Sequence, residues 1–433
     1  MGRIRAVSSV RVAPLTGLAL PILYLALACG RETEGQEAAR LDSDLDRRVQ
    51  ELLPDIEAYS GLPMQRVPAV RRADSETLET YLLERLETEY PGDELEALAS
   101  AYRAFGLIPD TLDVRRLLVD LLLEQAIGYY DPVRDVLFVR DQATGPMLDA
   151  VIVHELVHAL QDQQADLDSL THSVTGNDAR SAIQGAMEGH ATVVMMAHQY
   201  TEMTGTSTTP DDLPELGPEM AAAMADPSTF PELAAAPAIV RDPMLFAYLG
   251  GARYVQRLWR AQPDRPAPFG EWLPESTEQL LHTEKLLGER DSPTPIRIDD
   301  ASGDWQVTYA WDLGELEILI YFQEHLGDGE LAAEAAAGWD GDAYALLSRD
   351  GETALVWYTA WDSQAEADEF VEAYRRVFVA RFGGGPEGEL LVGDGRQAWV
   401  ERSIVSGVPV VCVIETAAGV VLESPPQVVV GAR

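Results

Sequence analysis

The chain has 433 residues, of which 46% are apolar and 24% are charged, enough to bury a core spread over two or three domains. Its 72 acidic and 32 basic residues give a formal charge of −40, which makes nucleic acid and anionic lipid poor candidates as partners because both are polyanions. The only cysteines, Cys29 and Cys412, exclude a disulfide framework and a cysteine-rich metal site, so a bound metal must use His, Asp or Glu.

Residues 1–28 are predicted to be a signal peptide, with arginines but no acid in the first twelve positions, then an apolar run and small residues. The apolar run is too short for a comfortable membrane span. Residues 25–29 resemble a bacterial lipobox, in which Cys29 is lipidated, although Ala26 stands where leucine is usual. We therefore expect a protein of the bacterial cell envelope, outside the cytoplasm and anchored to a membrane at Cys29, with 29–41 as a flexible tether. An ordinary secreted protein is the alternative.

Residues 42–295 are predicted to form a mostly helical domain. Apolar side chains recur at helical spacing over 42–125, and 127–140 have the pattern of a β-hairpin. Gly145 and Pro146 then open a helix that runs to about residue 164. Further helices are predicted over 179–200 and 244–259, and between them lies a Thr-, Pro- and Ala-rich loop, lid or weak helix, 204–240.

Residues 296–433 are predicted to form a second, smaller domain in which antiparallel strands pack on a helix. Its predicted strands are 306–310, 344–348, 355–361, 390–392, 397–404 and 408–414, and its predicted helices are 313–326, 330–337 and 365–382. The fold class of the whole chain is therefore predicted to be α+β.

The strongest chemical signal is His-Glu-x-x-His, formed by His154, Glu155 and His158. Positions i and i+4 lie one turn apart on one helix face, so both imidazoles can bind one metal ion. Glu155 can then reach a water in the open coordination position and take its proton as general base. The flanking residues are apolar, which predicts a buried helix whose histidines need partners. An ordinary core helix with hydrogen-bonded histidines is the alternative.

A catalytic zinc needs a third protein ligand. Gln161 and Gln164 stand where a metzincin would have glycine and histidine, which excludes that class. We predict that Glu188 is the third ligand, because it lies on the next helix between Gly185 and Gly189, which permit close helix approach. The competitors are His190, on a different helix face, and the residues of the connection, His172, Asp166 and Asp178.

This arrangement resembles the gluzincin metallopeptidases, and longer strings resemble poorly characterised bacterial secreted proteins and lipoproteins, together over most of residues 125–362. The resemblance implies a zincin-like catalytic domain over 42–295, one catalytic Zn²⁺ and peptide-bond hydrolysis. In thermolysin-like members an Asp four residues after the ligand Glu orients a zinc histidine. Thr192 stands at that position, so the surroundings of the metal must differ. Asp162 is a candidate substitute, and a solvated helix residue is the alternative reading of it.

The resemblance also implies an edge strand that binds extended substrate, for which residues 136–140 are the candidate, unless the hairpin is only structural. Gluzincins further need a donor to the oxyanion, and His282, beside the sole lysine Lys285, is the candidate. A structural role for His282 is the alternative, and Tyr248 and Tyr254 are weaker candidates. We interpret His198 and His325 as structural.

We therefore expect a membrane-anchored zinc peptidase acting on protein or peptide substrates outside the cytoplasm. Two alternatives stay open. One is a zinc-binding surface lipoprotein without proteolytic activity, in which the tryptophan-rich C-terminal domain is the working part. The other is a folding factor or protease regulator that binds clients without cleaving them. The presence of Glu155, the residue a base would require, favours the peptidase.

Overall fold

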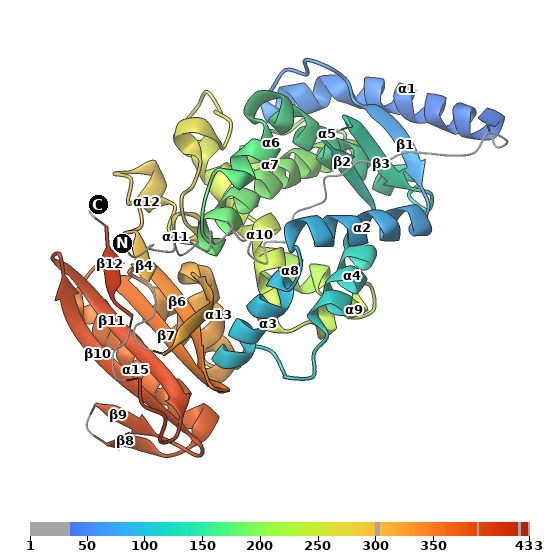
Figure 1. The fold of residues 1–433 in the computed structure, drawn as a ribbon. Coiled ribbons are helices and arrows are strands. Elements are labelled where there is room, and N and C mark those ends of the chain that lie inside the picture. The colour runs from blue at the N-terminus through green and yellow to red at the C-terminus, as the bar shows by residue number, and fades with distance from the viewer. Residues whose placement is uncertain (1–34, 133, 299–303, 388, 423–425, 432–433) are drawn as a thin grey trace, which may run out of the picture.

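The computed structural model describes residues 35–132, 134–298, 304–387, 389–422 and 426–431. The predicted signal peptide, Cys29 and the first part of the tether lie outside these residues. The chain has an α+β fold, as predicted: a helical region with a small sheet is followed by a large antiparallel sheet (Figure 1). Among the described residues, no helix combines the length and the apolar character needed to cross a membrane.

The N-terminal helix α1 (Gly35–Ser60) begins earlier than expected. The tether predicted over 29–41 is therefore helical from Gly35 onward, a correction that follows from good helix formers such as Glu37, Ala38 and Ala39. The following strand β1 (Ala69–Ala73) was not predicted, because its two arginines interrupt any apolar alternation.

The predicted β-hairpin is present as β2 (Gly128–Asp131) and β3 (Val136–Arg140). The prediction that residues 136–140 form an edge strand is wrong, because β3 pairs with β2 on one side and runs parallel to β1 on the other. The edge strand beside the helix of the His-Glu-x-x-His motif is β2. The sequence hides this arrangement, since β1 is distant in the chain and has weak strand character.

Helices make up the rest of this region (Figure 1). The helices predicted over 145–164 and 179–200 are present with similar bounds, whereas the helix predicted from 244 begins at Ala238, inside the segment predicted as a loop, lid or weak helix. A first layer consists of α2 (Ser75–Glu89), α3 (Glu94–Phe105) and α4 (Val114–Gln125). The centre consists of α5 (Gly145–Ala165), α6 (Leu167–His172), α7 (Asn177–Thr204) and α10 (Ala238–Ala261). Short helices fill the connections: η1 (Pro210–Asp212), α8 (Pro218–Met224), α9 (Pro231–Ala235), η2 (Gly270–Trp272), α11 (Thr277–Leu281) and α12 (Glu284–Leu287).

The C-terminal region is built on an antiparallel sheet of order β5-β6-β7-β11-β10-β9-β8. Its strands are β5 (Gln306–Trp311), β6 (Trp339–Arg349), β7 (Glu352–Trp361), β8 (Gly385–Glu387), β9 (Leu390–Val392), β10 (Arg396–Val405) and β11 (Val408–Ala417). One face carries α13 (Gly314–Leu326), α14 (Gly329–Ala336) and α15 (Gln364–Phe382), and a ribbon of β4 (Ile296–Ile298) and β12 (Val428–Val430) pairs separately.

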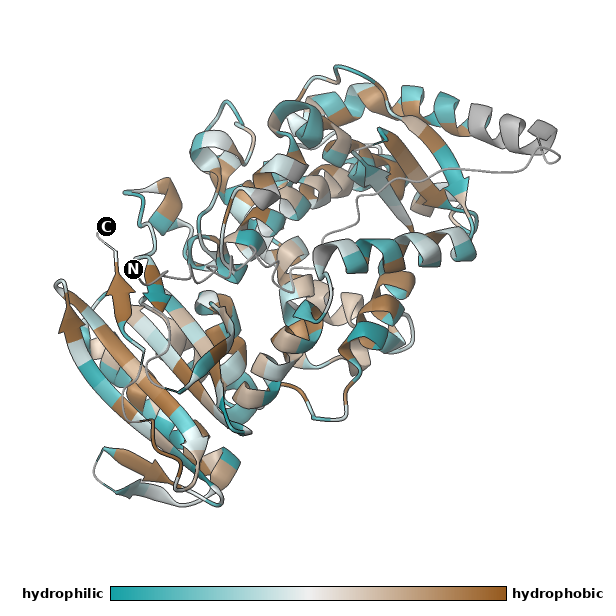
Figure 2. Cartoon of the chain, viewed as in Figure 1, coloured by the Kyte–Doolittle hydropathy of each residue, from teal (hydrophilic) through white to brown (hydrophobic). Residues whose placement is uncertain are grey.

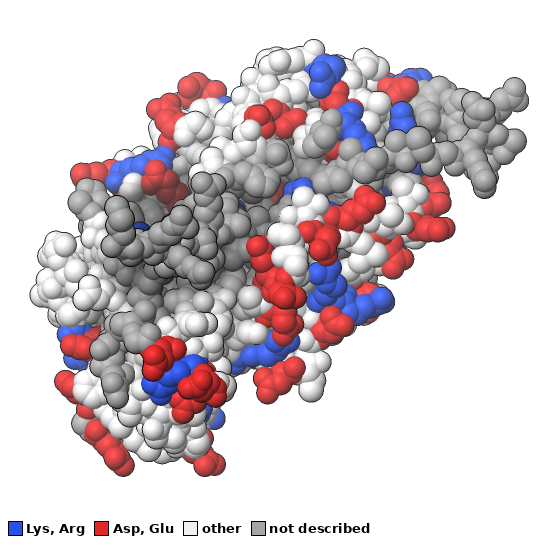
Figure 3. Space-filling view, in the orientation of Figure 1, with Lys and Arg blue, Asp and Glu red and all other residues white. Residues whose placement is uncertain are grey.

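Apolar packing crosses residue 295, where the domain boundary is predicted. One buried cluster joins helices α2–α4 to α13–α15 and the large sheet, whose strands carry the hydrophobic stretches seen in Figure 2. A second cluster joins α1, β3, α5, α7 and the later part of α10. Helix α10 contributes to both, so it connects the two halves. Acidic side chains gather over the face formed by α2–α4 (Figure 3), in line with the net charge of −40.

Candidate metal centre and its surroundings

Helix α5 places the histidines of the motif inside the protein. Pro146 lies in its first turn, and Asp166 ends it in the left-handed conformation. Apolar residues surround the motif on all sides, so the helix is buried through its middle rather than along one stripe. His154, Glu155 and His158 are consequently all buried, at 7%, 4% and 5% exposure.

Helix α7 brings Glu188 to the two histidines. The glycines beside Glu188 permit close approach to another helix, α10: a Cβ on Gly189 or on Gly251 of α10 would overlap the backbone of the facing helix. The buried Glu188 Oε2 lies 3.1 Å from His154 Nε2 and 3.5 Å from His158 Nε2, and the two nitrogens are 3.2 Å apart. The residues predicted as ligands from two separate helices therefore meet at one point.

The donor set fits a metal ion of zinc's size. Ligand atoms at about 2.0–2.1 Å from a tetrahedral centre lie roughly 3.3 Å from one another. The three observed separations, 3.1, 3.2 and 3.5 Å, bracket that value. Two imidazoles and one carboxylate also match the ligand preference of zinc. The three residues could therefore hold a metal ion.

The charges of the cluster reinforce one another. Burial opposes ionisation of Glu188, but the charge of His158 and hydrogen bonds from both histidines outweigh it and lower the pKa of Glu188 to about 2. Burial likewise opposes a charge on His158, but Glu188 raises the pKa of that ring to about 9. Glu188 is therefore a carboxylate at neutral pH, the form that binds a cation, and a bound metal would take the place of the proton on His158 Nε2.

Strand β2 holds Glu155 in place. The backbone N–H of Tyr130 donates to Glu155 Oε2 at 2.9 Å. The approach is close because Gly128 has no side chain: a Cβ there would overlap Val151 of α5 and come within 2.9 Å of the Phe138 carbonyl oxygen. Burial raises the pKa of Glu155. Glu155 Oε1 is thus left as the oxygen that can accept a proton.

The partner that orients His158 is Gln161, which sequence reasoning missed. Its Oε1 accepts from His158 Nδ1 at 2.9 Å, whereas Asp162 accepts from the Tyr130 hydroxyl at 3.2 Å and from the Leu167 N–H at 3.2 Å. The spacing gives a signal in hindsight, because Gln161 lies one turn after His158 on the same face of α5.

The competing ligands lie elsewhere. Asp166 caps α6 through the Ser169 N–H, and Asp178 accepts from the Thr277 N–H at the start of α11. His190 contacts Gln161 at 3.2 Å rather than the metal cluster, and the His172 side chain lies outside the described part of the structure. Among the predicted structural histidines, His325 contacts the Phe105 carbonyl and His198 is buried.

Tyr248 is the oxyanion-donor candidate that lies beside the metal cluster. Its ring lies 6.0 Å from that of His154, centroid to centroid, and burial followed by the charges of Glu188 and Glu155 raises its pKa well above the ordinary value. His282 Nε2 instead pairs with Glu315 Oε1 at 2.8 Å, and the Tyr254 hydroxyl donates to the Trp272 carbonyl.

A second carboxylate cluster contains its own cation. Oxygens of Glu278, Asp291 and Asp362 lie within 4.8 Å of one another. The ammonium group of Lys285 lies between them, at 2.6 Å from Glu278, 3.0 Å from Asp291 and 2.6 Å from Asp362. The sole lysine of the chain therefore fills the place a metal ion would take and joins α11 and α12 to the end of β7.

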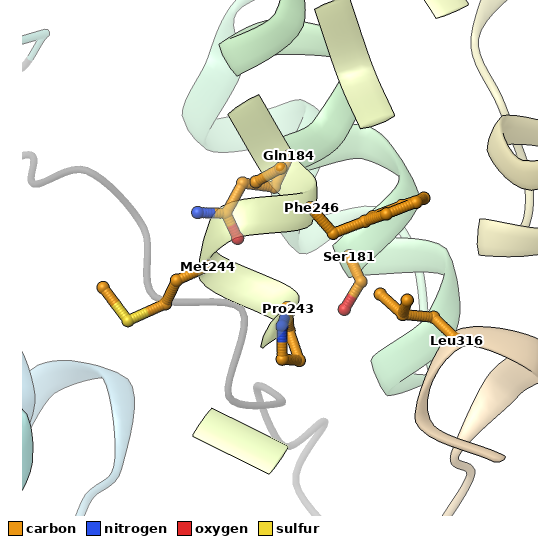
Figure 4. A pocket seen from close by; sticks show the side chains of 7 residues that line it. Ser181, Gln184, Pro243, Met244, Phe246 and Leu316 are labelled. Atoms are coloured by element: carbon orange, nitrogen blue, oxygen red, sulfur yellow. The ribbon is translucent and has the colours of Figure 1, made fainter. Parts of the chain in front are cut away.

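A small, mostly apolar recess of about 10 Å³, room for about one water molecule, lies in the groove between α7 and α10 (Figure 4). Gln184 and Met244 line it, and they precede Glu188 and Tyr248 by one helical turn, on the same helix faces. Leu316 of α13 closes it from the C-terminal region.

Comparisons with known proteins bear only on the C-terminal region. Residues 307–421 match a family described as "Domain of unknown function (DUF8575)". No curated protein and no solved structure matches the chain. The matched segment begins in β5 and ends just after β11, so it covers the large sheet and α13–α15 but none of the metal cluster.

Proposed function

We propose that this protein is a zinc-dependent peptidase acting outside the cytoplasm. The observation that carries the proposal is the cluster of His154, His158 and Glu188 at zinc-like separations, with Glu155 beside it. An N-terminal pattern typical of a signal peptide and lipobox supports an envelope location with Cys29 as the lipid attachment point.

Zinc held by these three residues would supply a Lewis acid that polarises a peptide carbonyl and makes water nucleophilic at neutral pH. The residues of the chain supply the rest. Glu155 Oε1 takes one proton from the attacking water as the water oxygen bonds to the carbonyl carbon. The same carboxyl then gives that proton to the amide nitrogen and the C–N bond breaks, which leaves a carboxylic acid and an amine. The second proton of the water passes from the acid to the amine, so a carboxylate and an ammonium group leave.

Two further residues serve the reaction. The Tyr248 hydroxyl donates to the oxygen that gains negative charge when the carbonyl is attacked. The Tyr130 N–H keeps Glu155 Oε2 occupied, so the free oxygen faces the water. We assign extended peptide substrate to the edge of β2.

Metal content and cleavage of casein or a peptide library test the proposal on wild type, Glu155→Gln and Glu188→Ala. We expect wild type to hold one zinc and to cleave, Glu155→Gln to hold zinc and be inactive, and Glu188→Ala to lose zinc. A wild-type protein that holds zinc and cleaves nothing would favour a binding role. A protein without metal would refute the proposal.

A further inference from the structure

A hydrogen-bonded relay leads from His158 to the end of helix α1. His158 Nδ1 contacts Gln161 Oε1 at 2.9 Å, and Gln161 Nε2 contacts the Met187 carbonyl at 2.9 Å and His190 Nδ1 at 3.2 Å. His190 Nε2 contacts the carbonyl oxygen of Ser60, the last residue of α1, at 3.2 Å. Gln161, His190 and Ser60 have no solvent exposure.

The direction of every bond in the relay follows from its last member. A backbone carbonyl such as that of Ser60 only accepts, so His190 Nε2 carries a proton and Nδ1 of the neutral ring accepts. The group facing His190 must then be the amide NH₂ of Gln161, and the Met187 carbonyl demands the same orientation. Gln161 Oε1 therefore faces His158 and accepts from its Nδ1–H.

The direction of these hydrogen bonds determines which nitrogen of His158 can bind a metal. With its proton on Nδ1, His158 presents the lone pair of Nε2 to the point where His154 Nε2 and Glu188 Oε2 meet. The opposite tautomer would direct an N–H at that point and leave Gln161 Oε1 without a donor in the interior, which is unfavourable. The relay thus selects the ligand form of His158.

We propose that Gln161 and His190 are positioning residues that fix the tautomer and orientation of His158 as a metal ligand and link metal binding to the seating of α1. This rests on the metal site of the proposed function but not on peptidase activity. Because Gln161 is neutral, it orients the ring without adding a negative charge, unlike an aspartate partner. By linkage, metal binding also stabilises the end of α1 that carries Ser60.

The test measures the affinity of the full chain for Zn²⁺ alone, by competition with a chromogenic chelator, and the absorption spectrum of the Co²⁺-loaded protein. Gln161→Met removes the relay at nearly constant volume, and Gln161→Glu restores an acceptor for His158. His190→Phe keeps a ring against Trp259, which packs edge-on at 5.4 Å, but removes both nitrogens. His198→Phe is the matched control, a buried histidine of α7 outside the relay.

We expect Gln161→Met to raise the zinc Kd about 10- to 100-fold and to change the cobalt bands. Gln161→Glu should restore part of the affinity, because it supplies an acceptor to His158 but no donor to the Met187 carbonyl and His190. His190→Phe should raise Kd less, about 10-fold, because Gln161 still bonds the Met187 carbonyl. In wild type, zinc should also slow hydrogen exchange at the end of α1, and His190→Phe should abolish that effect.

The inference is overturned if Gln161→Met, or His190→Phe should the first variant not fold, binds zinc with wild-type Kd and an unchanged cobalt spectrum. An equal loss in His198→Phe would overturn it too, because the effect would then be general destabilisation. Zinc binding without proteolysis leaves the inference standing and counts only against the peptidase. A wild-type protein that binds no zinc would refute both the inference and the proposed function.

Discussion

The glycine crossing of α7 and α10 makes a quantitative prediction. In Gly251→Ala the new Cβ would lie 1.8 Å from the Gly185 carbonyl oxygen, whereas real Cβ atoms stay at least 3.0 Å from such neighbours. The helices must therefore separate by 3.0 − 1.8 = 1.2 Å or more. Overpacking of this kind lowers the free energy of unfolding by about 1–3 kcal/mol. Alanine has a higher helix propensity than glycine, which offsets roughly 0.5–1 kcal/mol of this loss.

The same displacement separates Tyr248, on α10, from Glu188, on α7. A misplacement of about 1 Å is enough to lower a rate roughly 100-fold, while His154 and His158, on α5, stay with Glu188. We therefore expect Gly251→Ala to keep its zinc, to lose about 1–2 kcal/mol in urea unfolding and to lose about 100-fold in kcat.

The assay compares zinc content, urea unfolding and peptide kinetics with a matched control, Gly329→Ala. Gly329 opens α14, and a Cβ there would meet nothing within 4 Å. The control should match wild type in all three measurements. If Gly251→Ala unfolds at the wild-type urea concentration and cleaves at the wild-type rate, the crossing is not tight and the reasoning about Tyr248 fails.

Three further changes probe single residues. Tyr248→Phe should lower kcat about 100- to 1000-fold with zinc retained, and a loss of less than threefold in peptide kinetics would remove Tyr248 from the reaction. Lys285→Met leaves three carboxylates without their cation and should cost about 3 kcal/mol in urea unfolding, the low end for a broken buried pair because two of the partners keep some solvent. Burial raises the pKa of Glu317 to about 8 against hydrogen bonds from Asn177 and Tyr102. A carboxyl whose pKa is raised on folding stabilises the folded state fully below about pH 4.5, and this contribution is lost as the pH rises to about 8. The melting temperature of wild type should therefore fall over this pH range, and Glu317→Gln should make the fall smaller. A fall of the same size in the variant would contradict the assignment.

The sequence was sufficient wherever the signal is local. Helical spacing along α5, α7 and α10 depends on neighbours within a few turns, and the glycines beside Glu188 indicate close approach without naming the partner helix. The meeting of Glu188 with His154 and His158 could be predicted because the chemistry of a metal site demands a third ligand.

The failures share a cause, which is contact between residues far apart in the chain. Strand β1 exists because it pairs with β3, and that pairing is what makes residues 136–140 a central strand. The environment of His282 depends on Glu315 of α13, and the role of His190 depends on the carbonyl of Ser60. A backbone carbonyl, or a carboxylate that is distant in the chain, produces no sequence pattern around the residue whose role it determines.

Helix α7 connects the C-terminal region to the metal cluster, although the two are far apart in sequence. The first turn of α7 is held from that region, where Asp312 accepts from the Asn177 N–H and Glu317 accepts from the Asn177 side chain. Gly314 lies so close to Asp178 that a Cβ there would overlap its carboxylate. The middle of the same rigid helix carries Glu188. A shift of the large sheet would therefore move Glu188, the proposed metal ligand, so the region matched by the family model helps to fix the position of the cluster without contributing a residue to it.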